Sequence, residues 1–228
     1  PDQADPTQAG RKLAGIFGGS LNRVAIFDGT PTPSWEPVSI DVGGVFGAEA
    51  AGGYLVSLGD VRADSAGSAV RELIVAAGRR VAVFDVLGGE TGARPVINPV
   101  PVKVLTMTGG TITSMAVGRL LGGGFDEIIV ASNTAKGMTA GTTTVSLLDG
   151  ATLATLRSFT VTSRVESGPV RNLVDVFGFG AQVTTGDFDG NSMNDLVLGA
   201  GANGLGNFRV IGGEFVVSSL WFTDKVRY

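Results

Sequence analysis

The chain has 228 residues, of which 43% are hydrophobic and 36 are glycine, and its formal net charge at pH 7 is −4. It contains no histidine and no cysteine, which excludes a Ser-His-Asp triad, histidine-ligated zinc, thiol nucleophiles, iron–sulfur clusters and disulfides. The weak acidity disfavours a nucleic-acid-binding protein, and no apolar run reaches the roughly 18 residues of a membrane span.

The glycine content predicts short strands joined by tight turns. An interior glycine costs a helix about 1 kcal/mol, whereas the turns between strands use glycine readily. No segment has a sustained apolar period of 3.6 residues, so we expect almost no helix.

The expected strands form two series that interleave in constant order along the chain. Strands that end in an acid or a glycine are expected at residues 23–29, 80–85, 144–150 and 208–212. Their end markers Asp28, Asp85, Asp149 and Gly212 lie 57, 64 and 63 residues apart. Strands that end in glycine are expected at residues 56–59, 115–118 and 183–186. Each of these is followed by a polar loop and a further apolar strand, at residues 72–78, 127–131 and 195–199.

The two series indicate an internal repeat of about 60 residues. Each repeat predicts four antiparallel strands, and the fourth strand of the last repeat is expected at residues 215–222. A four-stranded antiparallel unit of this length is typical of a β-propeller blade. The expected fold class is therefore all-β, a β-propeller formed as a single domain or as part of one. Its repeat units are 1–45, 46–108, 109–174 and 175–228.

The number of blades stays open. Residues 4–13 parallel residues 63–73, so the chain is expected to begin inside the loop after the first strand of a blade. About 3.7 units are then present. The chain is either a closed four-bladed ring, completed by its own C-terminal segment, or part of a larger propeller that another chain completes through strand addition.

One loop has the spacing of a metal site. Asp187, Asp189, Asn191 and Asp195 occupy positions 1, 3, 5 and 9 of a nine-residue loop between two strands, and the carbonyl of Met193 stands at position 7. Calcium prefers six to eight hard oxygen ligands. The sequence predicts Ca²⁺ bound by these five residues. The alternative is a loop in which the acids only cap backbone N–H groups.

The last repeat resembles a known family. A Phe-Gly pair at 177–178 or 179–180, the segment 186–196 (GDFDGNSMNDL) and the Gly-Ala pair at 199–200 are similar to the FG-GAP (VCBS-like) repeat. That repeat builds the propeller of integrin α subunits and of many bacterial surface proteins. The resemblance implies calcium at the loop positions named above. It also implies an adhesion or surface-assembly role that is extracellular or at the cell surface.

The earlier repeats keep less of this pattern. Phe46 and Gly59 echo it in one unit, and Gly118 in the next. In the loop 118–127, an arginine and a leucine replace the first two acids, so we expect no metal there and an ion pair between Arg119 and Glu127. The longer loop 60–72 keeps only scattered oxygens, which favour a solvated loop over a degenerate metal site; they belong to Asp60, Asp64 and Glu72.

The sequence favours a binding or structural module over an enzyme. Residues 199–204 match G-x-G-x-x-G, but a strand rather than a helix is expected after them, so we expect no dinucleotide site and no catalytic residues. The expected partner is a protein or a glycan at a propeller rim. Two alternatives stay open: a carbohydrate-binding propeller, such as a lectin or the accessory portion of a polysaccharide-degrading enzyme, and an enzyme that uses Asp, Glu, Lys, Ser or calcium alone.

Overall fold

The computed structural model describes residues 12–16, 22–28, 35–63, 71–88, 94–137, 139–161, 164–167, 172–175, 177–191, 193–201 and 208–212. These residues form antiparallel sheets with one short α-helix, so the expectations of an all-β class and of almost no helix are confirmed. Among them, no helix is long and apolar enough to cross a membrane. The chain divides into two compact units, Pro1–Thr106 and Met107–Tyr228.

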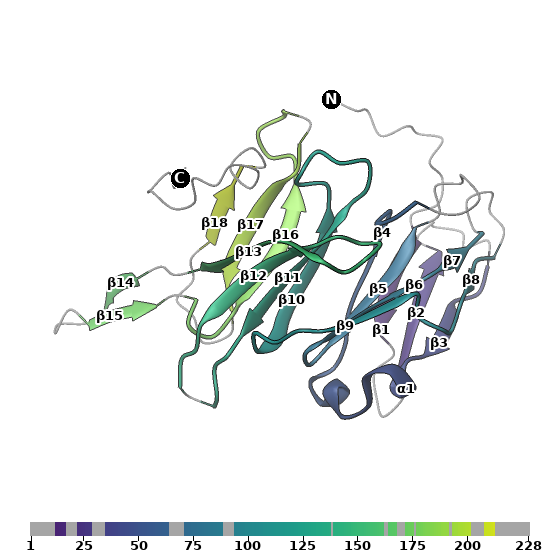
Figure 1. Cartoon of the computed structure of the whole chain (residues 1–228), viewed down its shortest axis with the longest axis horizontal. Helices are drawn as coiled ribbons and strands as arrows, with labels where there is room; N and C mark the ends of the chain where they lie inside the picture. Colours follow the sequence, from purple (N-terminus) through teal and green to yellow (C-terminus); the bar gives the residue numbers. More distant parts are fainter. Residues whose placement is uncertain are drawn as a thin grey trace. The chain divides into compact units, whose positions relative to one another are not determined.

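The first unit contains nine strands, a short helix and a 3₁₀ helix within its described residues (Figure 1). The strands are β1 (Lys12–Ile16), β2 (Arg23–Asp28), β3 (Val38–Asp41), β4 (Leu55–Gly59), β5 (Glu72–Ala77), β6 (Arg80–Phe84), β7 (Val86–Leu87), β8 (Val96–Ile97) and β9 (Lys103–Thr106). The helices are α1 (Gly43–Phe46) and η1 (Gly47–Gly52). The sheet orders are β1-β2-β3, β4-β5-β6-β9 and β7-β8, and every pairing is antiparallel.

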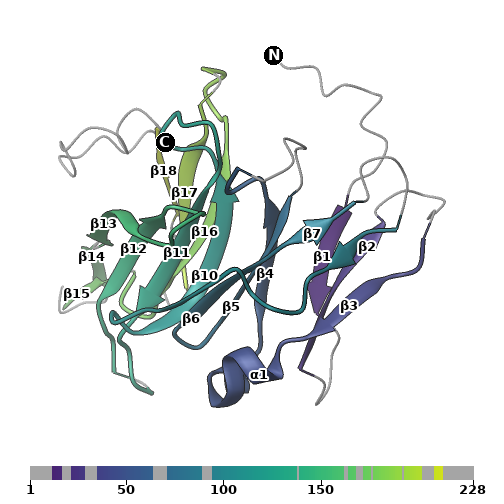
Figure 2. The same cartoon turned by 45° about the vertical axis from the view of Figure 1, so that its right-hand side comes forward.

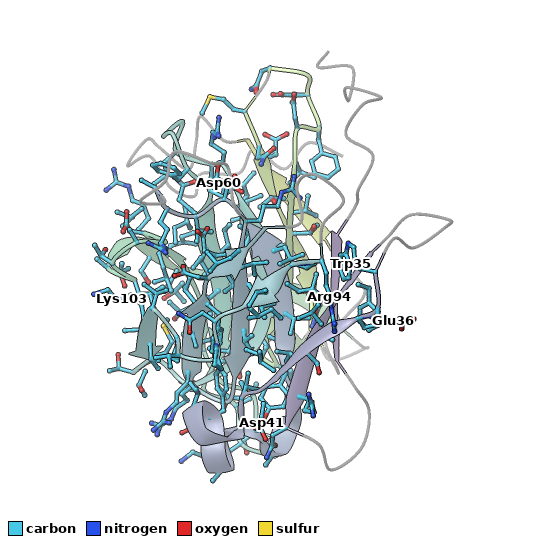
Figure 3. All side chains as sticks on the ribbon, turned by 90° about the vertical axis from the view of Figure 1, so that its right-hand side faces the viewer. Trp35, Glu36, Asp41, Asp60, Arg94 and Lys103 are labelled. Atoms are coloured by element: carbon cyan, nitrogen blue, oxygen red, sulfur yellow. The ribbon has the colours of Figure 1, made fainter. Side chains whose placement is uncertain are left out.

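The core of this unit is centred on the apolar strands β2, β5 and β6. All six residues of β5 are buried, which agrees with the apolar sequence that follows Glu72 on both faces of the strand. Phe46, from the expected Phe-Gly pair, is 1% exposed and meets the ring of Tyr54 edge-on. Figure 3 shows Asp60 and Asp41 toward opposite ends of this unit, with Lys103 on the β9 edge and Trp35 on the side of β3.

The second unit contains nine strands within its described residues. They are β10 (Thr111–Gly118), β11 (Glu127–Asn133), β12 (Thr143–Leu148), β13 (Thr155–Val161), β14 (Arg164–Ser167), β15 (Asn172–Asp175), β16 (Ala181–Gly186), β17 (Asp195–Ala200) and β18 (Phe208–Ile211). The sheet orders are β10-β11-β12-β13, β14-β15 and β16-β17-β18, again antiparallel throughout.

Two sheets of the second unit share one core. Strands β10 and β16 lie side by side (Figures 1 and 2), and apolar side chains of β11, β12, β16 and β17 form one cluster. Phe177 is fully buried in this cluster, whereas Phe179 is half-buried. Of the Phe-Gly pairs at 177–178 and 179–180, the first therefore supplies the buried aromatic ring.

The expected strands of both series are present where the structure describes them. The strands that follow the polar loops begin at Glu72, Glu127 and Asp195, as predicted. Strand β1 pairs with β2 as β5 pairs with β6, which agrees with the last residues of the parallel between 4–13 and 63–73; residues 4–11 and 64–70 lie outside the described residues. The strand expected at residues 215–222 lies outside the described residues. The helices α1 and η1 and the hairpins β7–β8 and β14–β15 were not predicted.

A buried side-chain network fastens the end of β11 to the segment before β16. Asn133 is 4% exposed, and its Nδ2 donates to Thr143 Oγ1 at 2.7 Å and to the carbonyl of Gly178 at 3.2 Å. Its Oδ1 accepts from the backbone N–H of Ala135, and the hydroxyl of Thr143 donates to the carbonyl of Phe177. Every polar atom of the Asn133 amide thus has a partner, as burial requires.

The substitution Asn133→Ala is expected to lower the free energy of unfolding by about 3 kcal/mol, because it leaves buried donors and acceptors without partners. Urea denaturation measures the effect. Asn98→Ala is the matched control, since Asn98 makes a similar hydrogen bond to the N–H of Val100 at an exposed position. Equal losses in the two variants would contradict a role for burial.

Candidate metal centre

The loop with metal spacing joins two paired strands of the second unit. Strand β16 ends at Gly186 and β17 begins at Asp195, and these two residues face each other in the antiparallel register. Asp187 and Asp195, the first and last acids of the loop, are therefore brought close together by the strand pairing alone. Asp195 is 1% exposed, whereas Asp187 and Asp189 are exposed.

Hydrogen bonds within the loop hold its curled backbone. Asp187 Oδ1 accepts from the N–H groups of Gly190 and Asn191 at 2.8 and 3.1 Å. Asp189 accepts from the backbone N–H and from Nδ2 of Asn191 at 3.2 and 3.1 Å. Gly190 has a φ of 77°, a left-handed conformation that glycine adopts without steric cost. The side chains expected as ligands thus also cap the turns of the loop.

Three carboxylates converge in this arrangement. One oxygen from each of Asp187, Asp189 and Asp195 lies within 4.8 Å of the others, so the cluster could hold a metal ion. Three like charges at this spacing repel one another, and a bound cation would offset that repulsion. The donor set is made of hard oxygens, which suit calcium or magnesium rather than a thiophilic metal.

The structure brings together three of the five predicted ligands. Asn191 Oδ1 accepts from the N–H of Met193 at 2.8 Å, and Asn191 Nδ2 donates to Asp189, so the amide is engaged within the loop. The ligand roles of Asn191 and of the Met193 carbonyl stay predictions. The sequence left two interpretations of this loop, metal binding and backbone capping. The same aspartates cap backbone N–H groups and form the carboxylate cluster, so the two interpretations are compatible.

The buried acid at the end of this loop also has a structural partner. Asp195 Oδ2 accepts from the backbone N–H of Phe188 at 2.9 Å. The ring of Phe188 is on the surface, with an exposed fraction of 61%. The loop therefore presents an aromatic side chain between its two exposed acids.

In the equivalent loop between β10 and β11, the acid that begins the second strand also accepts hydrogen bonds from the loop backbone. Glu127 is 6% exposed, and its Oε2 accepts from the N–H groups of Leu120 and Leu121 at 2.7 and 3.2 Å. Burial raises the pKa of Glu127, and these backbone hydrogen bonds oppose the rise. The expected ion pair with Arg119 is wrong: Arg119 Nη2 donates to the carbonyl of Gly124, so the guanidinium reaches the loop backbone.

The loop after β4 repeats the arrangement in the first unit. Glu72 is 2% exposed, and its Oε2 accepts from the N–H of Val61 at 3.0 Å. Arg62 lies between two acids, with Nε 3.7 Å from Glu72 Oε1 and Nη2 bonded to Asp85 Oδ1. Burial raises the pKa of Glu72 to about 7, although the Val61 N–H and the Arg62 charge both act to lower it.

Glu72 itself is shielded from solvent and lies beside a positive charge. Its carboxylate is a buried cap next to a guanidinium, and Asp64 lies outside the described residues. Residues 64–70 of this loop lie outside the described residues, so both readings of loop 60–72 stay predictions.

The three loops share a capping hydrogen bond that was not predicted from the sequence. In each, the acid that begins the second strand faces a glycine that ends the first, in the pairs Gly59–Glu72, Gly118–Glu127 and Gly186–Asp195. Each acid then accepts from the N–H two residues after that glycine. The signal was present in the sequence, because an acid starts each apolar strand at a corresponding place. All three loops thus share a capping acid, and the loop between β16 and β17 has two further aspartates at metal-ligand spacing.

No protein-family model and no curated protein matches the chain.

Proposed function

We propose that the chain is a non-enzymatic, calcium-stabilised β-propeller module of the FG-GAP type, which acts outside the cell or at its surface in adhesion or in structural interactions. The observation that carries the proposal is the convergence of Asp187, Asp189 and Asp195 within 4.8 Å on one loop. The same three residues occupy the acidic positions of the motif that resembles the FG-GAP repeat.

The sheet topology supports the propeller part of the proposal. The order β10-β11-β12-β13 follows the chain from one edge of the sheet to the other, and β4-β5-β6-β9 does so with one small hairpin inserted. Up-and-down sheets of four strands are the repeating element of propellers. The three glycine–acid pairs recur with the repeat and give each loop the same start and end.

Calcium fits the loop better than magnesium. Three carboxylates on a loop of nine residues supply hard oxygens, and calcium accepts irregular geometry completed by carbonyls and water. Magnesium requires a near-ideal octahedron at shorter distances. The proposed role of the ion is to neutralise the carboxylates and to stiffen the loop that carries Phe188, the exposed side chain that a protein or glycan partner would meet at the rim.

The aromatic residues give no separate support to a carbohydrate-binding function. Trp35 packs against the core of the first unit, and Tyr54 is buried with its hydroxyl donating to Asn22 Oδ1. Trp221 and Tyr228 lie outside the described residues. Trp35 and Tyr54 therefore do not support an exposed aromatic platform on which a sugar ring would stack.

Calorimetric titration of the chelator-treated protein with CaCl₂, together with urea denaturation with and without free calcium, tests the calcium part of the proposal. We expect one site per chain, and a gain in unfolding free energy of about 2.7 kcal/mol when free calcium is one hundred times Kd. Magnesium is expected to bind more weakly. Asp126→Asn is the matched control, because Asp126 belongs to the equivalent loop but not to the cluster. Absence of binding in both proteins would overturn the calcium site, and loss of binding in the control alone would place it elsewhere.

A further inference from the structure

Both ends of the candidate metal loop are hydrogen-bonded to the end of the neighbouring strand β10 and the residue that follows it. At one end, Thr185 Oγ1 donates to the carbonyl of Val117 at 3.0 Å. At the other end, the backbone N–H of Asn194 donates to the carbonyl of Arg119 at 3.2 Å. Thr185 lies two residues before Asp187, and Asn194 lies directly before Asp195. One short stretch of backbone therefore holds both termini of the loop.

Glycine at position 118 permits this close approach. A Cβ on Gly118 would lie 2.4 Å from Thr185 Oγ1 and 2.8 Å from Asn194 Nδ2, closer than such atoms can pack. Gly118 is itself buried, and it ends β10 opposite Glu127. A larger residue would require the side chains of Thr185 and Asn194, or the backbone that carries them, to shift.

The fastening bears on cation affinity because the ligands come from both ends of the loop. A cation must hold Asp187 and Asp195 at a fixed separation, and ordering a loose loop on binding costs free energy. Hydrogen bonds that fix the ends beforehand reduce that cost. The equivalent loop 119–126 lies at the other side of the same contact, so a change in its conformation would also act on the ends of the cation loop.

We propose that the backbone at residues 117–119 is a clamp that pre-organises the cation loop, and that it sets the calcium affinity of a site to which it supplies no ligand. This inference rests on the proposed calcium site. Thr185 and Gly118 are positioning residues in it. They act on calcium binding by fixing the positions of Asp187 and Asp195.

The test compares two threonines at opposite ends of the same seam between β10 and β16. Thr185→Val keeps the shape of the side chain and removes the hydrogen bond near the loop. Thr113→Val is the matched control, because Thr113 Oγ1 donates to the carbonyl of Ala181 at 3.1 Å, at the far end of β16. Thr185→Ser restores the hydroxyl.

Calorimetric titration with CaCl₂ gives Kd for each protein. We expect Thr185→Val to weaken calcium binding about fivefold, the usual worth of one hydrogen bond. Thr113→Val is expected to change Kd less than about twofold, although both variants lose thermal stability. Thr185→Ser is expected to bind nearly as the wild type does. Gly118→Ala is expected to weaken binding more than Thr185→Val if it folds.

A second readout does not depend on the ion. Amide hydrogen exchange at Asn194 in the presence of a chelator is expected to be faster in Thr185→Val than in Thr113→Val, because the clamp protects that N–H. Equal Kd values in the wild type and Thr185→Val, or equal weakening by both valine variants, would overturn the clamp while leaving the calcium site in place. A wild type that binds no calcium would overturn the proposed function and the clamp with it.

Discussion

The substitution Asp195→Ala is expected to lower the free energy of unfolding by about 2 to 3 kcal/mol in the presence of a chelator, and to abolish the further gain that calcium gives. The first effect follows from the buried position of Asp195 and its hydrogen bond to the N–H of Phe188, which would lose its acceptor. The second follows from the place of Asp195 in the carboxylate cluster. Chemical denaturation with and without calcium measures both.

Two further variants separate the cap from the ligand. Asp195→Asn keeps an oxygen that can accept from the N–H of Phe188, so it is expected to retain most of the stability in chelator and to lose the calcium response. Asp187→Ala is expected to lose the same calcium response with a smaller loss in chelator, because Asp187 is exposed. If Asp195→Ala were as stable as the wild type in chelator, the capping role would be wrong. If Asp187→Ala kept the full calcium response, the ligand role would be wrong.

The stability of the protein is expected to fall as the pH rises from about 4.5 to about 7.5, through the titration of Glu72. Its pKa in the folded state is about 7, above the ordinary value of 4.5. The folded state therefore holds the proton more tightly than the unfolded state does. The stabilisation is fully present below pH 4.5 and is lost as the pH rises through 7. Its upper limit is about 3 kcal/mol, from about 1.4 kcal/mol per pH unit.

Urea denaturation between pH 5 and pH 8 of the wild type and of Glu72→Gln measures this contribution. The glutamine has nearly the same shape, keeps an acceptor for the N–H of Val61, and does not titrate. The difference in unfolding free energy between the two proteins is expected to change with pH by up to the amount given above. Glu36→Gln, at an exposed position, is the control for surface carboxylates. A difference for Glu72→Gln that is constant with pH would show that the folded state does not hold this proton more tightly.

The charges around Glu72 set how much of this upper limit is reached. Arg62 favours the ionised form, whereas Asp60 favours the protonated form, and burial is the largest influence. Asp85 shares the guanidinium of Arg62, which weakens the support that Arg62 gives to Glu72. Replacing Arg62 with methionine is therefore expected to raise the pKa of Glu72 further, and so to increase the change in unfolding free energy with pH.

Much of the fold could be predicted from the sequence because its signals are local. An apolar run bounded by a glycine and an acid specifies a short buried strand wherever it occurs, and the starts at Glu72, Glu127 and Asp195 confirm this. The segment 43–52 was missed because its helices are a single turn or little more, too short for a periodic pattern. The two small hairpins were missed because strands of two to four residues carry no alternation.

The sequence determined one part of the candidate site, and the tertiary structure determined the other. The sequence by itself placed Asp187, Asp189 and Asp195 in one loop, since alternate positions in a tight turn come together without help from distant residues. Only the tertiary structure decided that Glu72 and Glu127 are buried caps, and that Arg119 bonds to Gly124. The clamp on Gly118 was also beyond the sequence, because it depends on how two strands 63 or more residues apart in the chain pack together. Packing between distant segments sets burial, and burial decides whether an acid acts as a surface charge, a cap or a ligand.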